Sequence, residues 1–148
     1  MREQGGADSA ANGRARRTGF HSVLVALYAL FSLAAGARSA VQISTNFSAA
    51  PLAYLLSALA AVIYILATIA LARDRISWAW PLCLIELFGV LIVGAASYLL
   101  PELFPDQTVW SHFGQGYLFI PLALPIAALW WMRRTAAAAV VDSESGRP

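Results

Sequence analysis

Glu86 is the residue whose type and position best suit it to chemistry. It lies inside an apolar run that extends from Trp78 to Leu100. If a helix begins near Ser77, the carboxyl group lies roughly 13 Å along the helix axis at about 1.5 Å per residue. That depth is close to the middle of a hydrocarbon layer about 30 Å thick. An ionised carboxylate there costs about 2.5 kcal/mol or more, so we expect Glu86 to face protein, either as a hydrogen-bonded packing group or as a proton carrier.

Two tyrosines fall at the same depth in other apolar runs. Tyr28 and Tyr64 each lie about eight residues from the inner end of their run, which is roughly 12 Å into the membrane. A protonated carboxyl can donate one hydrogen bond and accept another from a phenol. The sequence therefore predicts an intramembrane polar cluster of Glu86, Tyr28 and Tyr64.

Helical periodicity places this cluster on the inward faces of three helices. A membrane helix packs through its small residues, because close backbone approach replaces the missing hydrophobic driving force. The faces predicted to point inward contain Leu24, Tyr28, Ser32, Ala35 and Ser39 in the first run, Ala53, Ser57, Ala60, Ala61, Tyr64 and Thr68 in the second, and Ala79, Cys83, Glu86, Gly89, Val90, Val93 and Ser97 in the third.

The last apolar run contains two prolines, Pro121 and Pro125. Each removes a backbone donor and frees the carbonyl four residues earlier, at Tyr117 and Pro121 respectively. We predict a kinked helix here. A freed carbonyl near the middle of the membrane is a second possible hydrogen-bond partner for Glu86.

The segment between the third and fourth runs contains Glu102, Asp106 and His112. These three residue types can bind a metal, but their spacing matches no known ligand pattern, so we predict no metal site. We expect instead that Asp106 caps a short interfacial helix that ends at Gly114. Val109, Trp110 and Phe113 would then lie on one face of that helix.

The remaining chemistry-bearing patterns of soluble enzymes are missing from the sequence. It contains no phosphate-binding glycine loop, no CxxC, no HExxH and no nucleophile elbow. The single cysteine, Cys83, lies in an apolar run and is expected to be a small buried hydrophobic residue. We therefore expect a protein that is not an enzyme and has no cofactor.

Composition indicates a membrane protein. Of the 148 residues 59% are hydrophobic and 12% are charged, whereas a soluble domain has about a quarter charged residues. We predict an all-α, polytopic bundle of four transmembrane helices over residues 19–132. The tails, residues 1–18 and 133–148, are expected to lie in the cytoplasm, the first of them disordered. The four predicted spans are residues 19–40, 51–72, 77–100 and 116–132, each near the length that a spanning helix needs.

Arginines set the predicted orientation, since the chain has no lysine. Nine of the ten fall on one side of the spans and only Arg38 on the other, which places both termini in the cytoplasm of a plasma-membrane protein. The nine are Arg2, Arg14, Arg16, Arg17, Arg73, Arg75, Arg133, Arg134 and Arg147. Because they cluster outside the apolar runs, they do not indicate nucleic-acid binding.

A cleaved signal peptide is the alternative interpretation of the first run. Basic residues precede it, and the small residues 35–40 could form a cleavage site. The apolar stretch 20–37 is longer than most signal-peptide cores, so we expect the helix to be retained.

Segments 51–62, 101–111 and 116–125 resemble a group of small four-helix integral membrane proteins of GC-rich actinobacteria. The resemblance covers most of the chain outside the two tails. That group has no assigned biochemical activity, so the resemblance implies the membrane topology and no chemistry.

Small size, missing motifs and small-residue faces together favour a non-catalytic accessory or assembly subunit of a membrane complex. Its partners would be the lipid bilayer and either another membrane protein or a second copy of the chain. The alternative is a small proton-coupled transporter that uses Glu86 as its intramembrane carrier.

Overall fold

The computed structural model describes the backbone of residues 3–145 and the side chains of residues 18–141. The described residues form helices and connections, with no strand among them. The four α-helices are α1 (Glu3–Asn46), α2 (Pro51–Ala72), α3 (Ile76–Leu99) and α4 (Ile120–Ser145). Three short 3₁₀ helices complete the order: η1 (Phe47–Ala49) follows α1, and η2 (Pro101–Leu103) and η3 (Ser111–Tyr117) precede α4.

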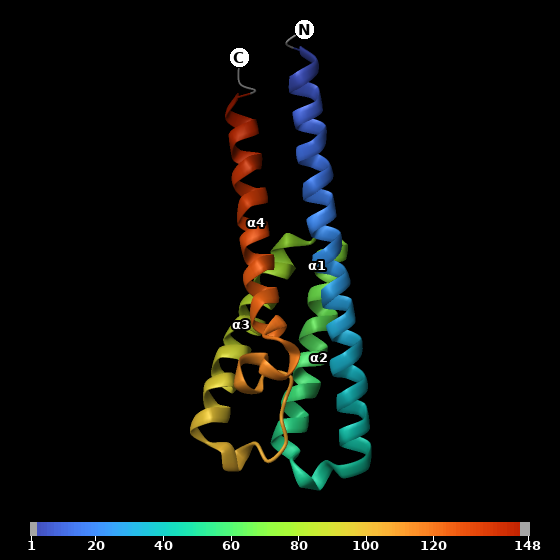
Figure 1. Ribbon diagram of the computed structural model, residues 1–148, viewed down its shortest axis with the longest axis vertical. Helices are drawn as coiled ribbons and strands as arrows, with labels where there is room; N and C mark the ends of the chain where they lie inside the picture. Colours follow the sequence, from blue (N-terminus) through green and yellow to red (C-terminus); the bar gives the residue numbers. More distant parts are fainter. Residues whose placement is uncertain (1–2, 146–148) are drawn as a thin grey trace.

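The helices form an elongated bundle with both chain ends at the same end (Figure 1). α1 packs along α2, and α3 packs against α2, η3 and α4. The α2–α3 turn lies on the side of the termini, and α1 and α4 extend past it (Figure 1). The connections from α1 to α2 and from α3 to η3 begin at the opposite end.

Three helical segments are long and apolar enough to cross a membrane. They are residues Thr18–Ala49, Pro51–Ala72 and Ile76–Leu99. A bent pair, Ser111–Tyr117 with Ile120–Val141, meets the same test when taken together, with an angle of 99° at the break. The described chain thus has three candidate spans, or four if the bent pair counts as one.

The second and third predicted ranges agree closely with α2 and α3. The first does not, because α1 begins at Glu3, inside the segment expected to be disordered. No proline interrupts residues 3–46, so the helix continues through this stretch although Gly5, Gly6 and Gly13 lower its intrinsic helix propensity. Residues 1–2 and 146–148 of the predicted tails lie outside the described residues.

The inward faces predicted for α2 and α3 match the buried residues, except that Thr68 and Gly89 are half-buried. In α3 the buried residues are Ala79, Cys83, Glu86, Val90, Val93, Gly94 and Ser97. The opposite side of α3 exposes large apolar side chains such as Phe88, Ile92 and Leu99. An apolar exterior around a small and polar interior is the pattern of helices that face lipid.

The fourth predicted span differs most from the structure. Residues 116–132 do not form one kinked helix, because the chain breaks at Leu118 and Phe119, whose φ angles of 56° and 58° are left-handed. α4 begins after this break, so Pro121 lies in the first turn of the helix, where a missing N–H costs little. Only Pro125 is inside the helix.

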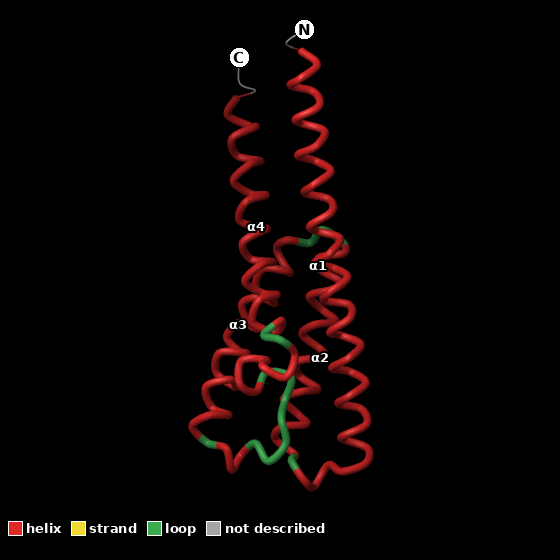
Figure 2. The backbone as a smooth tube through the Cα atoms, viewed as in Figure 1, coloured by secondary structure: helices red, strands yellow, loops and turns green. Residues whose placement is uncertain are grey.

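The segment that precedes α4 turns back into the bundle. Figure 2 shows this connection running from the far end of the bundle to the middle of its length before α4 begins. Residues 108–119, which we call the re-entrant segment, occupy the space beside α3, with Val109, Trp110, Ser111 and Gly114 buried. Non-helical backbone at this depth is tolerated where protein surrounds it.

Candidate functional site

The centre of the site is a hydrogen bond between α1 and α3. The Tyr28 hydroxyl donates to Oε2 of Glu86 at 2.7 Å. The same hydroxyl lies 3.4 Å from Sγ of Cys83, one turn before Glu86 on α3. All three side chains are fully buried at 0% exposure. Helical spacing thus places Cys83 and Glu86 on one face of α3, opposite a tyrosine of α1.

Tyr64 of α2 joins the cluster from the other side. Its ring lies 6.2 Å from the ring of Tyr28, measured between centroids. Its hydroxyl accepts a hydrogen bond from Nε1 of Trp110 at 3.1 Å. The structure therefore brings Glu86, Tyr28 and Tyr64 together, with Trp110 of the re-entrant segment as a fourth member.

Glu86 keeps one carboxyl oxygen without a partner. Oε1 is buried and accepts no hydrogen bond within the part of the chain that the structure describes. No arginine or histidine in this part forms an ion pair with the carboxyl group. The freed carbonyls of Tyr117 and Pro121, expected as possible partners, do not reach it.

This arrangement limits the chemistry that the cluster can perform. A nucleophile or acid must reach a substrate, and none of the Glu86, Tyr28 and Tyr64 side chains has exposed surface. In this conformation the cluster joins helices, and any proton movement through it needs a path that opens by rearrangement.

Two glycines of α3 leave the room that lets the re-entrant segment pack closely against this helix. An added Cβ at Gly89 would lie 2.7 Å from the Trp110 ring, and one at Gly94 would lie 2.8 Å from the backbone nitrogen of Phe113. Real Cβ atoms do not approach other atoms so closely, so both positions require glycine. Gly114 packs in the same way on Pro121, at a φ of 79°.

Buried backbone donors of the segment are satisfied by side chains. Thr108 Oγ1 accepts from the backbone nitrogens of Trp110 and Ser111, and Ser111 Oγ accepts from that of Thr108. The backbone nitrogen of His112 donates to Ser97 Oγ of α3 at 2.8 Å. Each unsatisfied donor in a membrane interior would cost several kcal/mol, so these bonds make the re-entrant path possible.

A polar network anchors the segment at the end of the bundle opposite the termini. Arg38 of α1 donates to the Tyr117 hydroxyl and to the backbone carbonyl of Gln107, each at 3.0 Å. Asp106 accepts from Tyr54 at 3.0 Å and from Gln42 at 3.2 Å. The sole arginine expected on that side is therefore used by the fold.

The prediction of an interfacial helix between α3 and α4 was wrong. Asp106 does not cap an interfacial helix, and Trp110 and Val109 are buried at 2% and 1% exposure instead of lying on a membrane surface. The left-handed backbone at His112 and Phe113 prevents a continuous helix over these residues. Glu102, Asp106 and His112 are not brought together, and no group of three or more such residues in the described range could bind a metal.

Sequence reasoning missed Trp110, Arg38 and the Thr108–Ser111 pair as parts of the site. One signal was present: Pro121 is typical of a helix that begins late, at about residue 120, since proline favours the first turn. If the helix starts there, residues 108–119 lie outside both α3 and α4. Their apolar side chains must then be buried elsewhere.

Comparison with protein-family models, with curated proteins and with solved structures finds no match to this chain.

Proposed function

We propose that the chain is a non-catalytic accessory or assembly subunit of a larger membrane complex. It crosses the plasma membrane four times, with the bent pair of η3 and α4 as the fourth span and both termini in the cytoplasm. The arginine distribution supports this orientation, because Arg73 and Arg75, the arginines at positions 14, 16 and 17 of α1, and Arg133 and Arg134 of α4 belong to one end of the bundle.

The sealed polar cluster supports a structural role for Glu86. A transporter exposes its carrier to the two sides of the membrane in turn. Here Tyr28, Cys83 and Trp110 close around the cluster, and no cationic side chain of the described residues forms an ion pair with the buried carboxyl. A neutral Glu86 that joins α1 to α3 accounts for these contacts.

An outward-facing groove between α1 and α2 is the observation that carries the proposal. The groove, which we call the α1–α2 groove, has a volume of about 580 Å³. Its lining is mostly small or apolar and comprises Ala29, Ser32, Leu33, Gly36, Ala37, Ala40, Ile65, Thr68 and Ile69.

Gly36 is the informative residue of this groove. A Cβ added there would meet nothing within 4 Å, so the packing of the chain itself does not require glycine. Ser32, Gly36 and Ala40 recur at intervals of four, the spacing that lets a second membrane helix approach the backbone closely. The groove is therefore suited to a helix from another protein.

The experiment is to purify the tagged full-length chain in a mild detergent and to identify stoichiometric companions by mass spectrometry. We expect a reproducible membrane protein partner. Recovery of the chain alone, as a discrete homodimer, would contradict the accessory role.

The alternative function, a small proton-coupled transporter, has one observation in its favour. Oε1 of Glu86 is a buried acceptor without a partner among the described residues, in a bundle whose last candidate span is broken between Tyr117 and Ile120. Proton flux into liposomes that contain the purified chain tests it. Flux that Glu86→Gln abolishes while the fold is retained would establish the transporter, whereas the accessory role predicts no flux from either protein.

A further inference from the structure

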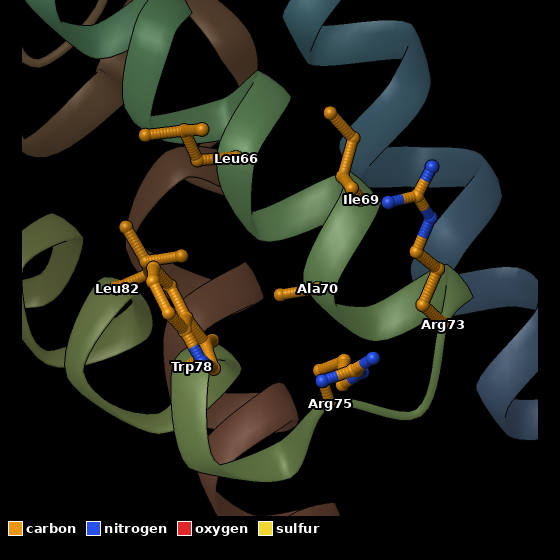
Figure 3. Close-up of a pocket in the computed structure, with 7 residues that line it drawn as sticks. All are labelled: Leu66, Ile69, Ala70, Arg73, Arg75, Trp78 and Leu82. Carbon is orange, nitrogen blue, oxygen red and sulfur yellow. The ribbon is translucent and has the colours of Figure 1, made fainter.

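A second groove lies between α2 and α3, next to the turn that joins them. This α2–α3 groove has a volume of about 440 Å³. Figure 3 shows Leu66, Ile69 and Ala70 on its α2 wall, and Trp78 and Leu82 on its α3 wall. The apolar walls belong to two of the candidate membrane spans.

Two arginines close the groove at the end where α2 passes into α3. Arg73 and Arg75 both line it (Figure 3) and both are exposed. Neither guanidinium forms a hydrogen bond or an ion pair with any residue in the described range. The groove therefore combines an apolar channel with two cations that the fold leaves uncompensated.

Asp74, the acidic residue between the two arginines, contacts His21 of α1 and neither arginine. Asp74 has a left-handed φ of 51°. Its carboxylate lies 3.5 Å from Nε2 of His21 on α1, and it is not among the residues that line the groove. Asp74 therefore forms no ion pair with either arginine in the described residues.

Arg133 and Arg134, at the same end of the bundle, differ from Arg73 and Arg75 because their guanidiniums contact aromatic rings. Arg133 lies over the Trp80 ring at 5.5 Å, and Arg134 over the Trp130 ring at 4.3 Å, measured to the ring centroids. These cation–π contacts engage both guanidiniums within the chain. Arg73 and Arg75 have no such contact in the described residues.

We propose that the α2–α3 groove binds one anionic phospholipid. The phosphate lies between Arg73 and Arg75, and an acyl chain lies along Leu66, Ile69 and Leu82. Trp78, which is 67% exposed, marks the headgroup level, where amphipathic rings prefer to sit.

The combination of walls and charges selects this ligand. A soluble phosphate would use the arginines but leave the apolar walls in contact with other lipids. A zwitterionic lipid such as phosphatidylcholine would use the walls and present a phosphate, but it would also bring its own cationic group next to the two arginines. Basic pockets between membrane helices are known to bind anionic headgroups, and only a ligand with both parts fits this groove. The inference is independent of the accessory role.

The test uses the purified full-length chain in nanodiscs of phosphatidylglycerol or of phosphatidylcholine with identical acyl chains. Native mass spectrometry after detergent extraction measures the lipid that stays bound. The variant is Arg73→Gln with Arg75→Gln. The matched control, Arg133→Gln with Arg134→Gln, removes the same charge from the same end of the bundle.

We expect one retained phosphatidylglycerol and no retained phosphatidylcholine. The groove variant should bind phosphatidylglycerol roughly 25-fold more weakly, because each basic residue near an anionic surface contributes roughly fivefold. The control should bind as the wild type does. Equal retention of the two lipids, or equal loss in the two double variants, would overturn the proposal.

A third variant tests the acyl-chain part of the site. Leu66→Trp fills the groove at a residue that is 46% exposed, so the core and both arginines remain intact. We expect it to release phosphatidylglycerol while circular dichroism shows an unchanged helix content. Undiminished binding to Leu66→Trp, or displacement of the lipid by inorganic phosphate alone, would show a site for the headgroup only and would contradict the proposal.

Discussion

Two faces of the bundle contain glycines with opposite relations to the rest of the chain. On α3, Gly89 and Gly94 lie against Trp110 and Phe113, and neither position has room for a Cβ. On α1, Gly36 faces outward, and a Cβ there would meet nothing. Packing within the chain explains why Gly89 and Gly94 are glycines, but it does not explain why Gly36 is one.

This difference separates a face that the chain itself fills from a face that it leaves open. The α3 face is filled by the re-entrant segment, whose buried backbone donors are bonded to Thr108, Ser111 and Ser97. The α1–α2 groove is left open in the same membrane-spanning region. A small residue without a neighbour inside a membrane span suggests a neighbour outside the chain.

The largest effect is expected from removing the side chain that fills the α3 face. Trp110→Ala should lower the free energy of unfolding by about 3–5 kcal/mol, because it leaves a cavity over Gly89 and removes the partner of the Tyr64 hydroxyl. Detergent or thermal unfolding followed by circular dichroism measures this. The control is Trp78→Ala at an exposed site, which should change stability by less than about 0.5 kcal/mol. Equal effects would show that the re-entrant segment is not packed as described.

A smaller loss is expected from adding one methyl group to the same face. Gly94→Ala places a Cβ against the backbone and ring of Phe113 and should lower the free energy of unfolding by about 1–3 kcal/mol. The same unfolding assay measures it. A neutral result would mean that the segment moves away from α3 without cost.

The opposite sign is expected on the open face. Gly36→Ala should raise the free energy of unfolding by about 0.5–1 kcal/mol, because alanine restricts the unfolded chain and meets no atom in the fold. The pair of Gly94→Ala and Gly36→Ala is thus a matched test of the comparison. A loss at Gly36 as large as that at Gly94 would remove the distinction between the two faces.

The sequence predicts the ranges of α2 and α3 and their inward faces well. The inward face of α3 follows from helical periodicity, because small and polar residues recur at that spacing through Cys83 and Glu86. The contact of Tyr28 with Glu86 follows from equal depth on two spans of the same bundle. Both depend on regular helices, in which the residue number fixes the face and the depth of a side chain.

The re-entrant segment could not be predicted in the same way. Its path depends on left-handed backbone at His112, Phe113, Leu118 and Phe119, none of which is glycine. Such conformations are held by the surrounding structure and leave no local signal in the residue types. The pattern of Asp106 and Gly114 instead indicated a capped helix, which tertiary packing against Gly89 and Gly94 overrides.

The most direct test of the accessory role compares two leucine substitutions in α1. Gly36 and Gly19 both have open space at the Cβ position, but only Gly36 lines the α1–α2 groove. Each tagged variant is purified beside the wild type, and stoichiometric partners are quantified by mass spectrometry. We predict that Gly36→Leu loses the partner while Gly19→Leu retains it, with unchanged folding in both. Full retention of the partner by Gly36→Leu would contradict the account.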